Sequence, residues 1–130
     1  MSKVAIIAAN GTLDAAYKVF NIATAAASMG SEVAIFFTFE GLKLIHKQAN
    51  QALPVPASMQ GIEGALSAHN VPAIPELVDI ARELGVSFIA CQMTVDLLGL
   101  KPEDLVDGIE VGGAATFLAF ANQANVSLTF

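Results

Sequence analysis

Short, continuous apolar runs recur along this chain of 130 residues, and a helical stretch separates most of them from the next. An apolar run of four to eight residues is typical of a strand that is covered on both faces of its sheet. Strands that alternate with helices favour a parallel sheet, because each parallel connection has to cross over a face of the sheet. The pattern therefore predicts one three-layer α/β/α domain over residues 1–130, with a mainly parallel sheet of about five strands and a flavodoxin-like architecture.

The elements can be placed from the same pattern. Strands are expected at residues 4–9, 32–39, 86–90, 109–111 and 126–130. Helices are expected at residues 13–29, 41–47, 75–84, 92–98 and 114–124, with a further helical turn at 102–105. Thr12 is expected to cap the first helix. Residues 50–70 have no clean period and predict a loop with one short helical piece, a kind of segment that often serves as a lid or partner surface.

The charge content of the chain restricts its partners. Charged residues make up only 14% of the chain, against the roughly 25% that is usual, so we expect other subunits to cover part of the surface in a homo-oligomer. The formal net charge of −6 disfavours nucleic acid, because phosphate binding needs clustered Lys and Arg. Residues 64–130 hold eight acids against two bases, a bias that suits either a basic protein partner or simple solubility.

The compartment is predicted from what the chain lacks. No apolar run approaches the roughly 20 residues of a membrane helix, and the first run is too short for a signal peptide. A single cysteine excludes an internal disulfide framework, so a reducing cytoplasm is expected. Neither that cysteine nor the distant His46 and His69 has metal-ligand spacing, and we expect no metal and no cofactor.

Candidate site residues follow the strands, because ligands of open parallel sheets bind at the carboxyl ends of the strands. Cys91 is the strong nucleophile among them. A helix that starts at Gln92 would bring free N–H groups and the positive end of the helix dipole to the thiol, and so lower its pKa. A buried, inert cysteine fits the same position about equally well. A pocket could also form from residues after the first two strands: Asn10, Gly11, Thr12, Phe39 and Glu40.

Two segments carry a resemblance to a known family. The segment Phe88-Ile-Ala-Cys-Gln-Met-Thr-Val-Asp-Leu-Leu-Gly99, followed by Asp107-Gly-Ile-Glu-Val-Gly-Gly-Ala-Ala115, resembles the DsrE/DsrF-like family. The likeness is to the branch often labelled peroxiredoxin-family or sulfur-carrier proteins, extends to residues 33–42 and is weakest at 50–70. It implies a DsrE-like fold and a cysteine, at the position of Cys91, that can hold a persulfide. It also implies oligomers and exchange with TusA-like carriers or rhodaneses.

The resemblance suggests a sulfurtransferase-like reaction. The Cys91 thiolate would attack the sulfane sulfur of a persulfide or thiosulfate, and an acceptor thiolate would then remove the outer sulfur. Gln92, Met93 and Thr94 are expected to stabilise the anionic persulfide from the helix start, and Gly112 with Gly113 to supply a second anion-binding nest. Taken alone, the glycine pair more readily indicates a tight turn with positive φ.

Three other functions remain open at this point. Asn10-Gly11-Thr12 could act as the phosphate loop of a flavin- or nucleotide-binding module, although no Gly-x-Gly-x-x-Gly or P-loop sequence is present. The chain could be a non-catalytic subunit of an oligomer. A one-cysteine peroxidase is less favoured, because no second cysteine can resolve a sulfenic acid.

Overall fold

The computed structural model describes residues 1–130, and its centre is a five-stranded parallel sheet with the order β4-β3-β2-β1-β5. Every apolar run that predicted a strand forms one, so the three-layer parallel α/β fold is confirmed. The strands are β1 (Lys3–Ala8), β2 (Glu32–Phe37), β3 (Ser87–Cys91), β4 (Ile109–Gly112) and β5 (Val126–Thr129).

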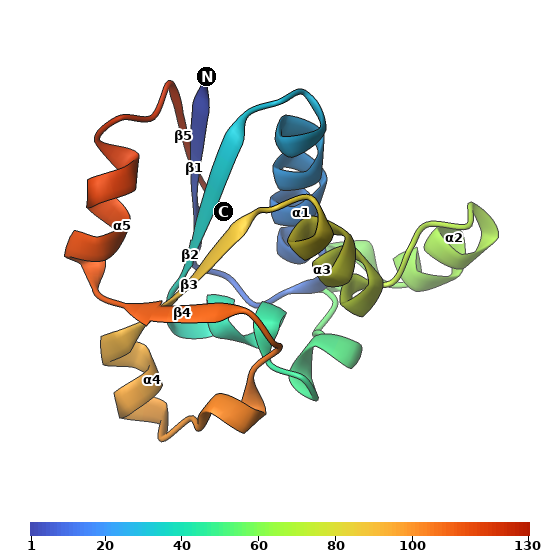
Figure 1. Cartoon of the computed structure of the whole chain (residues 1–130). Helices are drawn as coiled ribbons and strands as arrows, with labels where there is room; N and C mark the ends of the chain where they lie inside the picture. The colour runs from blue at the N-terminus through green and yellow to red at the C-terminus, as the bar shows by residue number, and fades with distance from the viewer.

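Helices cover both faces of the sheet, but unequally (Figure 1). Two helices, α1 (Leu13–Ser28) and α3 (Ile74–Glu83), cover one face, and α5 (Ala114–Ala121) alone covers the other. The helix α4 (Gln92–Leu98) continues directly from β3 and lies beyond the carboxyl end of that strand. None of the helices combines the length and apolar character that crossing a membrane requires.

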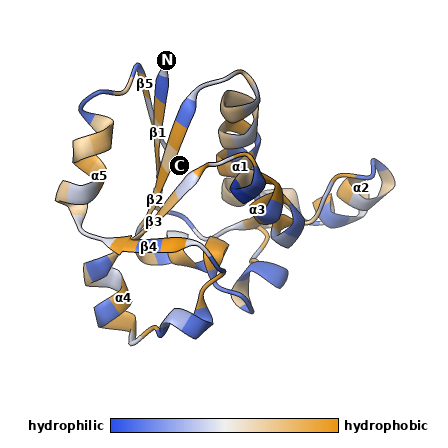
Figure 2. Ribbon diagram, in the orientation of Figure 1, coloured by the Kyte–Doolittle hydropathy of each residue, from blue (hydrophilic) through white to orange (hydrophobic).

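The larger core lies between the sheet and the pair α1 and α3. Its centre is a group of three fully buried aromatic rings, Phe20, Phe37 and Phe88, whose centroids are 5.4–6.3 Å apart. Tilted aromatic pairs of this kind add about 0.5–1.5 kcal/mol each beyond the area that they bury. Figure 2 shows the hydrophobic colouring concentrated on the central strands, as expected for strands that are buried on both faces.

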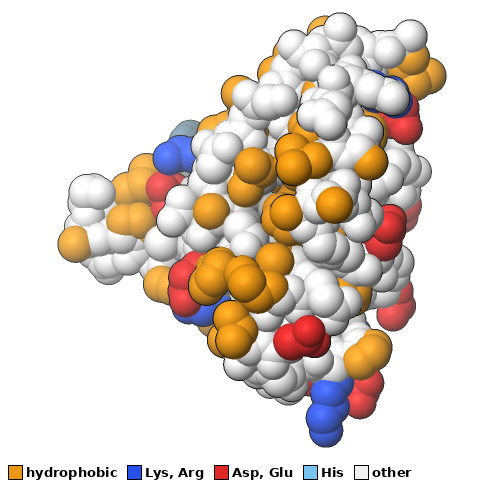
Figure 3. Space-filling model, turned by 90° about the vertical axis from the view of Figure 1, so that its left-hand side faces the viewer, with side chains coloured by type: hydrophobic (Ala, Val, Ile, Leu, Met, Phe, Trp, Pro, Cys, Tyr) orange, Lys and Arg blue, Asp and Glu red, His pale blue; other side chains and the backbone are white.

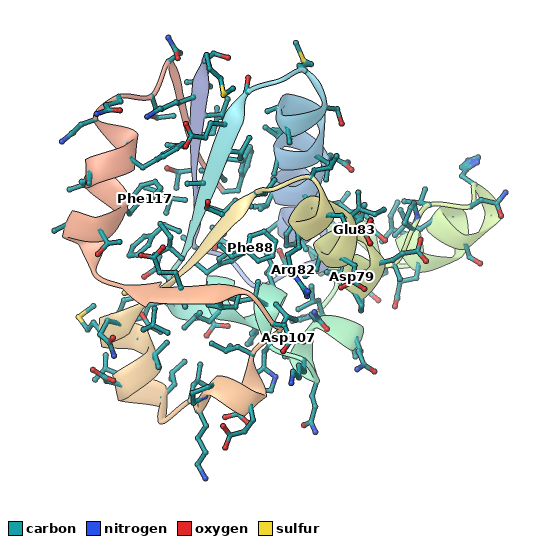
Figure 4. The ribbon with its side chains drawn as sticks, in the orientation of Figure 1. Asp79, Arg82, Glu83, Phe88, Asp107 and Phe117 are labelled. Atoms are coloured by element: carbon teal, nitrogen blue, oxygen red, sulfur yellow. The ribbon has the colours of Figure 1, made fainter.

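The opposite face of the sheet has a much smaller core. Phe117 is the one buried residue of α5, and its ring stacks on Phe36 with centroids 5.2 Å apart. Figure 4 shows Phe117 and Phe88 on opposite sides of the sheet. Cys91 belongs to this smaller cluster, together with Ile89 two residues earlier on the same strand. The thiol therefore lies on the thinly covered side of the molecule.

One connection differs from the prediction and another agrees with it. The short helix expected at 41–47 is a 3-10 helix that begins earlier and spans Phe39–Ile45. Its first residue, Phe39, has a left-handed backbone conformation with φ of 48°. Residues 50–70 contain the one expected helical piece, α2 (Ile62–Ala68), which has no buried residue and projects away from the sheet (Figure 1).

Candidate functional site

Cys91 is both the last residue of β3 and the N-cap residue of α4. The sequence Ser-Phe-Ile-Ala-Cys keeps the strand extended and buried, and Gln92 then starts the helix with no intervening loop. Only 6% of the cysteine is exposed. The thiol is the only one in the chain, and the fold holds it at the carboxyl end of an interior strand, where the sequence predicted it.

Opposing effects act on the Cys91 thiol. Burial raises its pKa, because the thiolate loses water. Hydrogen bonding from the side chain and backbone N–H of Thr94, the Thr38 hydroxyl and the Met93 N–H stabilises the thiolate and lowers the pKa. The hydrogen bonds outweigh burial, so the pKa of Cys91 lies below its ordinary value. A thiol in this setting has a larger thiolate fraction at neutral pH than a free cysteine.

Thr94 links the cysteine to the neighbouring loop. Its side chain is buried, and its Oγ1 accepts a hydrogen bond of 3.2 Å from the backbone N–H of Phe39. A hydroxyl can accept one hydrogen bond and donate another, so the group that holds Phe39 can also donate toward the thiol. This bond helps to hold Phe39 in its left-handed conformation, with the ring half exposed at the carboxyl end of the sheet.

We expect Thr94→Val to raise the pKa of Cys91. Valine keeps the volume but removes the hydroxyl, so burial is opposed by fewer hydrogen bonds and the thiolate fraction at neutral pH falls. The measurement is the pH dependence of iodoacetamide alkylation, whose midpoint should move to higher pH in Thr94→Val and stay near the wild-type value in Thr94→Ser. An unchanged midpoint in Thr94→Val would show that the hydroxyl does not act on the thiol.

Gly112 is the neighbour of Cys91 across the sheet. The two residues are Cα partners in the pairing of β3 with β4, and a Cβ on Gly112 would lie 3.0 Å from the side chain of Thr116. The predicted tight turn with positive φ is wrong, because neither Gly112 nor Gly113 takes positive φ. The predicted nest is not formed either, since Gly113 is extended with φ of −86° and ψ of −178°. Gly112 instead ends the edge strand without a side chain beside the thiol.

Four of the five predicted pocket residues line two separate hollows, and Gly11 lines neither. Asn10 and Thr12 line an open hollow of about 430 Å³ that also includes Thr129 and Phe130 of the C-terminal end. Phe39 and Glu40 line another, of about 230 Å³, that includes Leu98 and His46. Cys91 lines neither hollow.

Gly11 explains why these two loops are so close. A Cβ at this position would lie 2.5 Å from the carbonyl oxygen of Glu40, so a residue with a side chain would push the loops apart. Gly11 does not have positive φ, and its role is close approach of the backbone.

The start of α1 is poorly suited to a phosphate group. The first N–H of the helix, at Leu13, donates to the carbonyl oxygen of Pro54 at 2.9 Å. Thr12 is the N-cap residue of α1, as expected, but its side chain makes no capping hydrogen bond with the helix. The Thr12 hydroxyl and the Lys18 ammonium lower the pKa of Asp14, so this helix end already has a carboxylate of its own. A bound anion would have to compete with that carboxylate.

One contributor to the site, Thr38, was missed in the sequence, and the left-handed conformation of the predicted pocket residue Phe39 was not foreseen. Thr38 was placed inside the second strand, yet it follows β2 and its hydroxyl lowers the pKa of Cys91. The position of Thr38 at a strand end was the available signal, because the carboxyl ends of neighbouring parallel strands meet. The left-handed Phe39 had no such signal, since bulky residues rarely take positive φ.

These features define a class: three-layer parallel α/β proteins with one activated thiol at the carboxyl end of an interior strand. The chain belongs to the DsrE/DsrF/DrsH-like family, whose model matches residues 1–60 and 55–129. This confirms the family that the segments around Cys91 and Gly112 resemble.

Individual relatives agree with this assignment. The chain is 37% identical to the sulfur carrier protein DsrE2 of Allochromatium vinosum over 153 aligned positions, which cover 97% of this chain and 96% of that protein. It is 32% identical to the uncharacterized protein YrkE of Bacillus subtilis, with 95% and 93% of the two chains covered. Its fold is similar to the crystal structure of the YchN protein of E. coli, with a TM-score of 0.74 and 17% identity over the full length of both chains.

Proposed function

We propose that this chain is a sulfur carrier that holds a persulfide on Cys91 and passes the outer sulfur to partner proteins. The observation that carries the proposal is the position of the only thiol, at the carboxyl end of β3 and the start of α4. The lowered pKa of Cys91 agrees with it, because the thiolate is the nucleophile in sulfur transfer. The similarity to a protein named as a sulfur carrier supports the same chemistry.

In the first step, the Cys91 thiolate attacks the sulfane sulfur of a donor persulfide. A new S–S bond forms at Cys91 while the S–S bond of the donor breaks, and the donor leaves as a thiolate that takes up a proton. With thiosulfate as donor, the leaving group is sulfite. The sulfane sulfur moves without any external oxidant or reductant, so the step balances within the two reactants.

In the second step, a thiolate of the acceptor attacks the outer sulfur and Cys91 leaves. A thiol with a lowered pKa is the better leaving group, so the hydrogen bonds that favour attack also favour release. While the sulfur is held, the N–H groups of Met93 and Thr94 stabilise the anionic persulfide. The outer sulfur is joined to the buried Sγ by an S–S bond of about 2.05 Å. It is therefore easier for an acceptor thiolate to reach than the Sγ itself.

The expected partners follow from the same chemistry. A chain with one cysteine has to receive the sulfane sulfur from a donor persulfide or thiosulfate and deliver it to a thiol of another protein, and TusA-like carriers and rhodaneses could serve as such partners. A reducing, cytoplasmic compartment would keep such a thiol available. We also propose a homo-oligomer, because apolar side chains are exposed in several places, the projecting α2 region among them. Sedimentation velocity of the full chain measures the subunit number.

Intact mass spectrometry tests the proposed function. After exposure to thiosulfate or a persulfide donor, we expect a gain of one sulfur atom per chain that a reductant reverses. The gain should grow with pH through the lowered pKa of Cys91, because only the thiolate attacks. No adduct with either donor, from a protein whose thiol is alkylated at a normal rate, would contradict the proposal.

The alternatives have less support. A flavin or nucleotide module needs an anion site at the start of α1, where Pro54 and Asp14 already occupy the polar groups. A non-catalytic subunit does not need hydrogen bonds that lower the pKa of a cysteine. A peroxidase would require an outside thiol for every turnover, since Cys91 is the only cysteine.

A further inference from the structure

Exposed apolar side chains gather on the side of the molecule that carries Cys91. Met93 and Leu97 are 55% and 68% exposed and lie one helical turn apart on α4. Leu118 of α5, the residue after the buried Phe117, is 49% exposed. Figure 3 views this side and shows groups of hydrophobic side chains on it, with both acidic and basic side chains toward its edges. We call the surface formed by Met93, Leu97 and Leu118 the thiol face.

The segment that carries the thiol face is acidic. Two lysines of other segments also reach it: Lys3 lies over the Phe120 ring of α5 and Lys43 lines a hollow with Leu98 of α4, and each is ion-paired with a glutamate. Residues 91–130 contain five acids and a single base, Lys101. None of the four ion pairs of the chain involves a residue of this segment. Asp96 lies on α4, and Glu110 lies on β4 as the Cα partner of Ile89, two residues before Cys91 on the same face of the sheet. Both acids are exposed and have no cationic partner.

We infer that the thiol face docks a protein whose own thiol lies in an apolar surface ringed by Lys and Arg. The inference rests on the proposed function, because a sulfur acceptor or donor has to bring its thiol to Cys91. An apolar centre excludes water and a complementary rim speeds and orients the encounter. The unpaired Asp96 and Glu110 supply one half of that complementarity.

Other occupants fit the charges less well. In an isologous contact the thiol face of one copy would meet the same face of the other, so acids would oppose acids. Anionic lipid headgroups and nucleic acid phosphates would be repelled for the same reason. A basic protein surface is the macromolecular partner that these side chains attract.

Disulfide exchange with synthetic peptides tests the docking surface. Three peptides would each carry one cysteine, activated as a 2-thiopyridyl disulfide, in an apolar core that is flanked by Lys and Arg, by Ser, or by Glu. The Cys91 thiolate attacks the peptide sulfur, pyridine-2-thione leaves, and its absorbance gives the rate. We expect the basic peptide to react about tenfold faster than the Ser peptide at low salt, the acidic peptide to be slowest, and the differences to shrink at high salt.

Variants that remove acidic side chains test which of them cause the faster reaction of the basic peptide. The double variant Asp96→Asn, Glu110→Gln should lose most of the advantage of the basic peptide. The matched control, Glu76→Gln, Glu83→Gln, removes two exposed acids of α3 on the other face of the sheet (Figure 4 shows Glu83) and should retain it. Equal rates for the three peptides, or equal losses in the two double variants, would overturn the docking surface.

Two further measurements distinguish a failure of the docking surface from a failure of the proposed function. The small neutral reagent dithiodipyridine reports the thiol alone, so a Cys91 that reacts with it but not selectively with the peptides contradicts only the docking surface. A thiol that resists dithiodipyridine as well contradicts the proposed function. Peptide rates that fall as protein concentration rises would show that a second copy covers the face, and would also overturn the inference.

Discussion

Replacing Cys91 by serine is expected to abolish sulfur loading and to slow sulfur transfer between partner thiols by more than about 1,000-fold, the scale seen when a catalytic nucleophile is removed. Serine has nearly the same volume, so the strand end and the start of α4 should keep their structure. Its hydroxyl stays protonated at neutral pH and is a weak nucleophile there. No other thiol can replace the lost one, because Cys91 is the only cysteine. Loading is measured by intact mass and transfer by the mass of the acceptor.

A variant whose only thiol lies elsewhere tests whether sulfur loading depends on the position of the thiol or only on its presence. The double variant Cys91→Ser, Ser87→Cys moves the only cysteine to the exposed first residue of the same strand, away from Thr94 and Thr38. A thiol there lacks the hydrogen bonds that lower the pKa of Cys91, so we expect slow loading with the pH dependence of an ordinary cysteine. Loading as fast as in the wild type would mean that any exposed thiol suffices and that the site at the strand end adds nothing.

The sheet could be predicted from the sequence because its signals are local. Each strand is a single apolar run, and the helix α3 has Leu77 and Ala81 on one buried stripe, with Glu76 in its first turn. The position of Cys91 followed from the same local pattern, since Gln92–Leu98 forms a helix directly after the strand.

The remainder of the site depends on contacts between segments far apart in the chain. Phe39 is left-handed although nothing in its own neighbourhood favours that conformation, and its N–H meets Thr94, 55 residues later. The strand register brings Gly112 beside Cys91, but the conformation of Gly113 is set by the connection to α5. The hydrophobic periodicity of the sequence does not report contacts between distant segments. For this reason it did not predict that the pocket residues would line two hollows or that the nest would not form.

Gly41→Ala is expected to destabilise the protein by about 3 kcal/mol, at the upper end of the usual cost of overpacking. Gly41 lies in the 3-10 helix Phe39–Ile45, and its backbone rests against the end of β1. A Cβ there would overlap the carbonyl oxygen of Ala8 and lie 2.5 Å from its carbonyl carbon. Both are backbone atoms of a central strand, so no side chain can rotate away and the segment itself has to move. Urea unfolding measures the loss as a lower midpoint at an unchanged slope.

The matched control is Gly64→Ala in α2. Nothing lies within 4 Å of a Cβ at Gly64, so the added methyl group costs no packing. Alanine is favoured over glycine inside a helix by about 1 kcal/mol, and we expect the unfolding midpoint to stay the same or rise slightly. Equal midpoints for Gly41→Ala and Gly64→Ala would contradict the close contact between Gly41 and β1.

The same substitution connects the fold to the chemistry. Movement of Gly41 displaces Phe39, two residues earlier, and stretches the bond from the Phe39 N–H to the Thr94 hydroxyl. Thr94 then holds the thiolate less well while burial continues to raise its pKa, so alkylation of Cys91 in Gly41→Ala should need a higher pH than in the wild type. Gly64→Ala should leave the alkylation profile unchanged, because α2 projects from the sheet and has no part in the site. We therefore expect Gly41 to influence the reactivity of Cys91 indirectly, through its backbone contact with Ala8 and through the hydrogen bond between Phe39 and Thr94.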